Sequence, residues 1–144
     1  EGLDMTQEMV TVRPLPFVTP LTAPFWASAR ERKLVIQRCD DCGRLRFPPE
    51  VGCFYCGSTK SSWALMSGRA TLYSWTVAHP PLLPYFHQRA PWPVAAVQLE
   101  EGPRLISNLI DVPVAEYEFG MPLVADFEDV DWETTLVVFR RRAG

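Results

Sequence analysis

The amino-acid sequence predicts a mainly β protein, in which an N-terminal helical segment and a cysteine-rich metal ribbon precede a five-stranded barrel. Three observations lead to this fold class. All four cysteines lie within residues 39–56, as two C-x-x-C pairs with ten residues between them. Fourteen prolines favour short strands, turns and ordered loops over long helices. From residue 63 onward, short strand-like runs are separated by turn signals.

Length and composition are those of a globular domain. The chain has 144 residues, of which 47% are hydrophobic and 22% charged. We divide it into an extension with a short helix at 1–33, a ribbon at 34–62 and a barrel at 63–144. No apolar run approaches the ~18 residues of a membrane helix, and the first residues do not form a signal peptide. We therefore expect a cytoplasmic protein with no membrane partner, which could be a piece of a longer chain.

Residues 20–33 predict a short helix before the ribbon. Thr22 is expected to cap it, Pro24 fits its first turn, and Phe25, Trp26 and Ala29 would form one face. Two interpretations of this face remain open: it docks a partner, or it covers the ribbon.

The cysteine spacing predicts a closed four-thiolate metal site. In each pair the two sulfurs flank a tight turn whose backbone amides can stabilise thiolate charge. Gly43 and Gly57 each follow a second cysteine, where a left-handed backbone is commonly needed. Four thiolates suit a structural Zn(II), although iron in a rubredoxin-like site would use the same ligands. The predicted ligands are Cys39, Cys42, Cys53 and Cys56.

Two disulfides and a thioredoxin-type redox site are weaker interpretations of the same cysteines. Disulfides need an oxidising compartment, and nothing in the sequence signals export. A thioredoxin-type motif opens a helix, whereas the strand-like segments 34–38 and 44–48 flank the first pair here.

The C-terminal part carries five strand-like runs with one irregular connection. Residues 101–103 form a turn between the second and third runs, and residues 111–120 suit one helical turn that ends at Gly120. Three strands, a short helical connection and two more strands form the order of an OB-fold barrel. An SH3-like barrel or a small sandwich is the alternative. The strands are expected at residues 70–79, 93–100, 104–110, 121–129 and 134–140.

A long, proline-stiffened loop at residues 80–92 joins the first two barrel strands. Long ordered loops are often functional, and this connection is a usual binding rim of OB-folds. Its aromatic side chains could instead cap the mouth of the barrel. The two histidines, His79 and His87, belong to no recognisable catalytic motif. The candidate binding residues of the loop are Tyr85, Phe86, Arg89 and Trp92.

Charge is unevenly distributed along the chain. The net charge is −3, yet residues 30–60 hold seven basic and four acidic residues, a local charge of +3. The acidic remainder argues against a general nucleic-acid binder. The basic ribbon could hold a phosphorylated small molecule.

With these motifs in order, the chain resembles the family called domain of unknown function 35. The resemblance extends from about Phe25 to Phe139, and implies an OB-fold with an N-terminal rubredoxin-like zinc ribbon held by the four cysteines. One departure is Ala70, which stands where the family often has a second glycine, and which argues against a very close backbone approach there. The segments that carry the resemblance are FWASARERKLVIQRCDDCGRLRFPPEVGCFYCGS, SGRATLYSWTVAH, PVAAVQLEEGPRLISNLI and GMPLVADF.

The resemblance implies an accessory role beside a thiolase-fold acyl-CoA enzyme. In archaeal mevalonate synthesis a family member bridges a thiolase and a hydroxymethylglutaryl-CoA synthase. In actinobacterial steroid degradation a similar domain forms the C-terminal part of an enoyl-CoA hydratase subunit. It assembles with a thiolase-like aldolase that cleaves the steroid side-chain CoA ester. The second case, as a heterotetramer of two plus two subunits, is the preferred interpretation.

We therefore predict a non-catalytic subunit that stabilises such an aldolase and helps form its CoA-substrate channel. Phe25 and Trp26 are the expected partner contacts, because the many aromatic residues suggest an exposed apolar surface. The loop aromatics would stack adenine or line the pantetheine passage, with Arg89 beside them. The CoA phosphates would be bound near the ribbon by Arg38, Arg44 and Arg46.

Three alternatives stand beside this prediction. The chain could bridge another thiolase and acyl-CoA synthase pair. A nucleic-acid-binding ribbon and barrel is disfavoured because residues 93–134 are rich in acids. An independent enzyme is disfavoured because the sequence shows no open metal position, glycine-rich phosphate loop or nucleophile motif.

Overall fold

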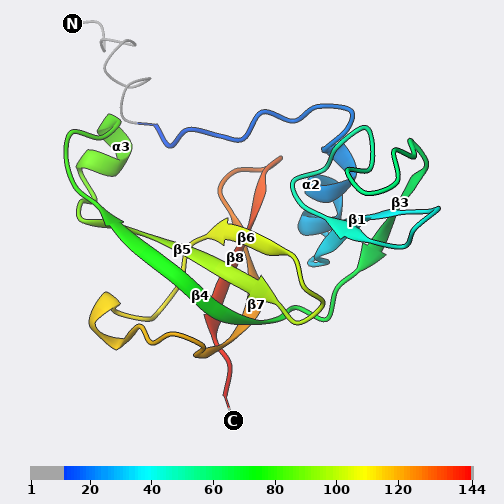
Figure 1. Ribbon diagram of the computed structural model, residues 1–144. Coiled ribbons are helices and arrows are strands. Elements are labelled where there is room, and N and C mark those ends of the chain that lie inside the picture. The colour runs from blue at the N-terminus through cyan, green and yellow to red at the C-terminus, as the bar shows by residue number, and fades with distance from the viewer. Residues whose placement is uncertain (1–11, 144) are drawn as a thin grey trace, which may run out of the picture.

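The computed structural model describes residues 12–143, which form two antiparallel sheets and short helices (Figure 1). A three-stranded sheet in the order β2-β1-β3 builds the ribbon. A five-stranded sheet in the order β6-β5-β4-β7-β8 curls into the barrel. The predicted mainly β class, with a zinc-ribbon region and an OB-fold, is confirmed. No helix among the described residues is long and apolar enough to cross a membrane.

The N-terminal segment runs as extended chain from the neighbourhood of α3 (Pro84–His87) to α2 (Ala23–Arg30) (Figure 1). Pro24 lies in the first turn of α2, as predicted, but the helix is shorter than residues 20–33. Thr22 occupies the N-cap position, as predicted, but its side chain does not cap the helix. Its hydroxyl accepts a hydrogen bond from the Thr19 backbone N–H at 3.0 Å and bonds no N–H of the helix.

The ribbon sheet is centred on β1 (Val35–Cys39), which pairs antiparallel with β2 (Leu45–Arg46) and β3 (Ser61–Leu65). Strand β3 is absent from the sequence-based prediction, because SSWAL has neither clear alternation nor a long apolar run. Its pairing with the whole of β1 makes it a strand. The register runs from Val35 opposite Leu65 to Cys39 opposite Ser61.

The barrel follows the predicted order, with a single 3-10 turn, η1, between its third and fourth strands. The third strand ends before residue 110, because Leu109 leaves β5 and forms a parallel bridge with Phe139. Phe139 is fully buried and exchanges backbone hydrogen bonds with residues 108 and 110, which closes the barrel. The elements are β4 (Arg69–Ala78), β5 (Trp92–Leu99), β6 (Arg104–Ser107), η1 (Val114–Glu116), β7 (Pro122–Asp129) and β8 (Thr135–Arg141).

Ribbon and barrel share one hydrophobic core. Leu34 and Ile36 of the ribbon segment and Phe25 of α2 belong to the same buried cluster as Leu123 and Phe139 of the barrel. Burial of a common apolar surface fixes the two parts against each other. The ribbon is therefore part of the folded body and not a loosely attached module.

The β7–β8 hairpin is tied to the end of α2 by a bidentate ion pair. Arg32 donates to the two carboxylate oxygens of Asp129 at 2.9 and 2.6 Å, and Thr135 donates to the same carboxylate at 2.6 Å. These hydrogen bonds, chiefly the one from Arg32, hold the pKa of Asp129 well below its usual value of 3.8. The ion pair is surface-exposed, so it serves mainly to orient the two elements.

We predict that Asp129→Asn reduces the acid sensitivity of the fold. A carboxyl group whose pKa is lowered by folding contributes stability above its unfolded pKa, and this contribution is lost as the pH falls through the folded value. The loss of stability of the wild-type chain from about pH 5 to pH 2 should therefore be less steep in the variant. Urea midpoints across this range measure it. Asp111→Asn, at an exposed position, is the control, and equal slopes for all three proteins would contradict the prediction.

Candidate functional site

The four cysteines converge in space. Their Sγ atoms all lie within 4.8 Å of one another. The Cys39–Cys56 and Cys42–Cys53 sulfur distances are 3.5 and 3.6 Å. A tetrahedral zinc site with Zn–S bonds of about 2.3 Å places its sulfurs about 3.8 Å apart, whereas a disulfide needs about 2.05 Å. The arrangement fits four ligands around one metal ion, and the cysteines are free of disulfides.

Each C-x-x-C pair forms the same tight turn. Gly43 N–H donates to the Cys39 carbonyl and Gly57 N–H to the Cys53 carbonyl, both at 2.9 Å. The predicted left-handed conformation is confirmed, with φ of 76° at Gly43 and 77° at Gly57. The turn therefore directs backbone N–H groups at sulfur in both halves of the site.

The electrostatics of the site call for a cation. Hydrogen bonds from the backbone N–H of Cys56, which has the larger effect, and of Tyr55 lower the pKa of Cys53 to about 6. The backbone N–H of Cys42 lowers the pKa of Cys39 in the same way. At Cys56 the Ser58 N–H acts in the same direction, but the neighbouring thiols and burial outweigh it and raise the pKa to about 12. Thiolates this close repel one another, and a bound dication removes that repulsion.

A buried polar network holds the segment that leads into the second cysteine pair. Gln37 on β1 is 2% exposed. Its Oε1 accepts from the Glu50 N–H at 2.8 Å and from Arg46 Nε at 2.9 Å. Its Nε2 donates to the Glu50 carbonyl at 3.0 Å and to Ser61 Oγ at 3.1 Å. The amide of Gln37 thus pairs with the backbone of Glu50 as a strand neighbour would, three residues before Cys53. Sequence alone offers no signal for it, because an isolated glutamine in a strand normally faces solvent.

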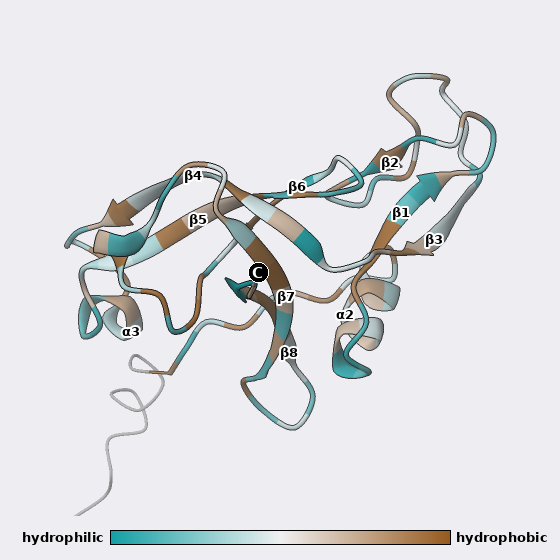
Figure 2. Cartoon of the chain, turned by 90° about the horizontal axis from the view of Figure 1, so that it is seen from below, coloured by the Kyte–Doolittle hydropathy of each residue, from teal (hydrophilic) through white to brown (hydrophobic). Residues whose placement is uncertain are grey.

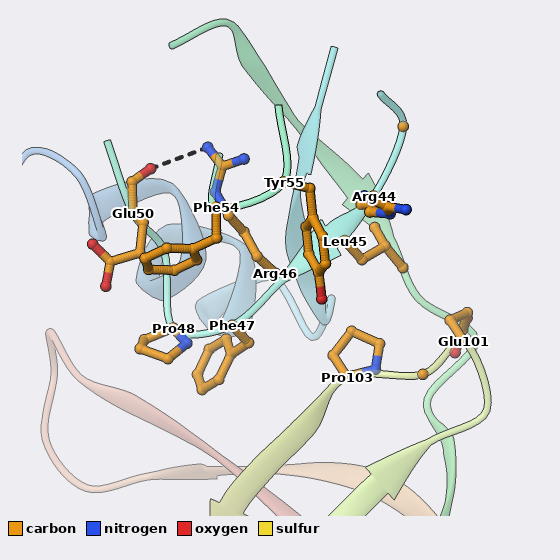
Figure 3. Close-up of a pocket in the computed structure, with 12 residues that line it drawn as sticks. Arg44, Leu45, Arg46, Phe47, Pro48, Glu50, Phe54, Tyr55, Glu101 and Pro103 are labelled. Carbon is orange, nitrogen blue, oxygen red and sulfur yellow. Dashed lines mark hydrogen bonds between the residues drawn. The ribbon is translucent and has the colours of Figure 1, made fainter. Parts of the chain in front are cut away.

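The three ribbon arginines occupy different environments. Arg38 is exposed on β1. Arg44 is exposed, and its Cζ lies 4.1 Å from the ring centroid of Tyr55. Arg46 is only 8% exposed, and its second hydrogen bond goes from Nη2 to the Glu50 carbonyl at 3.1 Å. Arg44 and Arg46 line a common hollow of about 640 Å³ (Figure 3).

The loop residues form a separate aromatic cluster. The rings of Tyr85, Phe86 and Trp92 pack with centroids 5.0 to 6.5 Å apart. Arg89 Cζ lies 3.6 Å from the Tyr85 centroid, and Arg13 approaches the same ring while pairing with Glu128 at 3.3 Å. The short helix α3 within the loop is absent from the sequence-based prediction.

The two sets of candidate residues do not meet. Helix α3 and the aromatic cluster lie at one end of the molecule, and the ribbon lies at the other (Figures 1 and 2). The structure therefore brings Arg44 and Arg46 to one hollow and Arg89 onto the loop aromatics, but it leaves Arg38 outside the hollow and the ribbon far from the loop. His79 and His87 are both exposed, and neither side chain makes a hydrogen bond within residues 12–143.

Helix α2 borders an apolar groove of about 390 Å³. Phe25 is buried, with its ring centroid 5.1 Å from that of Trp26 and 5.5 Å from that of Phe47. The opposite walls come from β6 and β8, where the two barrel edges separate beyond the Leu109–Phe139 bridge. Phe17 and Ile106 line this groove with 88% and 72% exposure.

The fold and the four-cysteine site together define a protein with a zinc ribbon and an OB-fold. The ChsH2 rubredoxin-like zinc ribbon domain matches residues 26–61, and the ChsH2 C-terminal OB-fold domain matches residues 63–128. One chain of a solved structure titled "Ltp2-ChsH2(DUF35) aldolase" is 41% identical, with a TM-score of 0.79, over 88% of this chain and 98% of that one. The chain belongs to the DUF35 family, as the sequence resemblance predicts.

Curated relatives agree with this assignment. A probable enoyl-CoA hydratase alpha subunit of Thermomonospora curvata is 41% identical over 93% of this chain and 41% of its own length. The 3-oxo-4,17-pregnadiene-20-carboxyl-CoA hydratase alpha subunit of Mycobacterium tuberculosis is 37% identical over 77% of this chain and 35% of its own length. A DUF35 domain-containing scaffold protein of Pyrococcus furiosus is 35% identical over 67% of this chain and 71% of its own length. The chain thus spans less than half of the two hydratase subunits.

Proposed function

We propose that this chain is a non-catalytic accessory domain that binds and stabilises a thiolase-fold acyl-CoA enzyme, a steroid side-chain CoA-ester retro-aldolase, and helps form its CoA-substrate channel. The observation that carries the proposal is the 41% identity to the DUF35 chain of the Ltp2–ChsH2 aldolase, across 98% of that chain. The cysteine cluster supports a non-catalytic role, because four thiolates fill the coordination of a zinc ion and leave no position for substrate.

In this role the ribbon would bind one structural zinc through Cys39, Cys42, Cys53 and Cys56. The metal would neutralise the crowded thiolates and cross-link the two turns. The ribbon and helix α3 lie at opposite ends of the molecule, so the ribbon arginines and the loop aromatics would border different stretches of the acyl-CoA path.

The apolar groove beside α2 is the surface we assign to the aldolase partner. An exposed aromatic and aliphatic surface of this kind is typical of permanent interfaces. Trp26 and Phe25 form one wall, and Ile106 stands exposed on the other. Of the two predicted contact residues, the partly exposed Trp26 could touch a partner, whereas Phe25 is only 6% exposed and would support the wall from beneath.

Ile106→Asp is expected to weaken binding to a thiolase-like aldolase at least tenfold. The substitution places a charge in an apolar contact, where desolvation without a partner is unfavourable. Co-expression, followed by titration of the purified proteins, measures the change. Phe119→Asp is the matched control, since Phe119 is 76% exposed but packs against Trp75 and does not line the groove. Equal binding by the wild type and Ile106→Asp would refute the assignment of the groove.

The role itself is tested by turnover. When assembled with this chain, the aldolase should cleave its steroid CoA ester, and the measured mass of the complex should correspond to two copies of each subunit. The chain alone should show no turnover. Turnover by the isolated chain would overturn the non-catalytic assignment.

A bridging role between a thiolase and an acyl-CoA synthase is the second candidate. It is favoured by the similarity to the Pyrococcus furiosus scaffold protein, of which this chain covers 71%. Co-purification with two different enzymes, instead of one, would distinguish it from the aldolase role.

A further inference from the structure

Strand β6 (Arg104–Ser107) is an open edge of the barrel sheet. It is the first strand in the order β6-β5-β4-β7-β8 and is drawn in yellow in Figure 1. Among residues 12–143, the one hydrogen bond from β6 to the opposite edge, β8, goes from Ser107 Oγ to the Val137 carbonyl at 2.8 Å. The apolar groove beside α2 lies where the two edges are no longer joined.

The backbone N–H and C=O of Ile106 point away from β5. In an antiparallel strand, alternate residues direct these groups at the neighbouring strand, and the residues between direct theirs away from it. The Leu99 N–H donates to the Pro103 carbonyl at 2.9 Å, so the odd-numbered residues of β6 are the ones that bond to β5. The Asn108 carbonyl instead accepts from the Phe139 N–H at 3.0 Å. Ile106 has the orientation of Asn108, but its backbone groups make no hydrogen bond within the described residues.

The surface beside this free backbone is apolar and uncharged. Ile106 is 72% exposed, and no charged side chain lines the groove. The N-terminal segment contributes Phe17 to the lining but forms no hydrogen bond with β6. Neither a proline nor a lysine protects the four residues of this edge. A free strand edge next to an apolar groove is suited to an added strand.

We infer that the aldolase partner docks by adding a short extended segment to the edge of β6. The backbone of that segment pairs with the N–H and C=O of Ile106, and its alternate side chains enter the groove toward Trp26. Because the groove presents no charge, these side chains are apolar. The inference rests on the proposed function and adds the mode of recognition, in which the backbone supplies affinity and the groove selects the side chains.

Proline at position 106 tests the backbone hydrogen bond directly. Proline lacks an N–H, but an edge strand tolerates it where that N–H would face away from the sheet. Ile106→Pro should therefore fold, and should bind the aldolase about tenfold more weakly than Ile106→Val, which keeps the N–H and an apolar side chain. Titration of the purified, zinc-loaded variants with a thiolase-like aldolase measures the Kd, and circular dichroism checks the fold.

Leu65→Pro is the matched control. Leu65 is 66% exposed on β3, an edge strand of the ribbon sheet, and lies outside the groove. The next N–H along the chain, that of Met66, donates to the Leu34 carbonyl, so the N–H of Leu65 faces away from β1. The substitution thus removes an equivalent free N–H from the other sheet, and should leave the Kd unchanged.

Amide hydrogen exchange tests the same contact in the wild-type chain. The Ile106 amide should exchange at least tenfold more slowly in the complex than in the free chain, because the added hydrogen bond protects it. The amide of Phe119, which lies outside the groove, should exchange at the same rate in both.

Equal Kd values for Ile106→Pro and Ile106→Val overturn the inference. If Ile106→Pro does not fold, unchanged exchange at Ile106 in the assembled complex overturns it instead. A dimer of the chain alone that Ile106→Pro disrupts would assign the edge to a second copy of this chain, which also contradicts the inference. A complex that forms without protection of Ile106 leaves the accessory role intact, whereas a wild-type chain that does not assemble refutes the proposed function and this inference with it.

Discussion

Cys39→Ser is expected to abolish zinc binding and to lower the free energy of unfolding by about 5 kcal/mol or more. Structural zinc contributes about 10–16 kcal/mol to small zinc domains, and a whole domain is stable by only about 5–15 kcal/mol. Between Asp40 and Lys60, Cys53 is the one buried hydrophobic residue, while Val51, Phe54 and Tyr55 are exposed, so this part of the ribbon depends mainly on the metal. Metal content by mass spectrometry and urea unfolding followed by circular dichroism measure the two effects.

The same experiment reports on cooperativity. Because Leu34 and Ile36 belong to the barrel core, loss of the metal should destabilise ribbon and barrel together. Thr59→Ala, at an exposed position on the second cysteine turn, is the matched control and should keep zinc and stability. A Cys39→Ser chain that retains one zinc and the wild-type unfolding midpoint would show that the four cysteines are not the ligand set.

The parts of the fold that could be predicted are those set by local pattern. The cysteine spacing, the glycines after each pair and the alternation within β4 are signals read from neighbouring residues. Strand β3 could not be predicted, because SSWAL becomes a strand only through its pairing with β1. The end of β6 is likewise decided by a tertiary contact, the bridge between Leu109 and Phe139.

The candidate site was likewise predictable only where the signal is local in sequence. The four cysteines were accessible to sequence reasoning, but the distance between the ribbon and the loop was not, since no local signal reports which ends of a fold are adjacent. The exposed pair Phe54 and Tyr55 was also missed. A signal was available there: two adjacent aromatic residues between cysteine ligands cannot both be buried by so small a turn.

Gln37→Leu is expected to lower the free energy of unfolding by about 3 kcal/mol, although it replaces a polar side chain in a buried position with an apolar one of similar size. The change leaves the N–H of Glu50 and Nε of Arg46 without their acceptor, and a buried group left unpaired costs about 1–3 kcal/mol. Loss of the Glu50 anchor should also speed zinc release, because Cys53 follows three residues later. Urea unfolding and the rate of metal transfer to a chelator measure both effects.

Gln98→Leu provides the matched comparison. Gln98 also accepts from an arginine, Arg104, and donates to a backbone carbonyl, that of Gly102, but these bonds are exposed. Water can replace them, so the same substitution should cost under about 1 kcal/mol and leave zinc release unchanged. Equal costs at both positions would mean that burial does not set the strength of the Gln37 network. A stable Gln37→Leu chain with faster zinc release would instead assign Gln37 to holding the metal ligands alone.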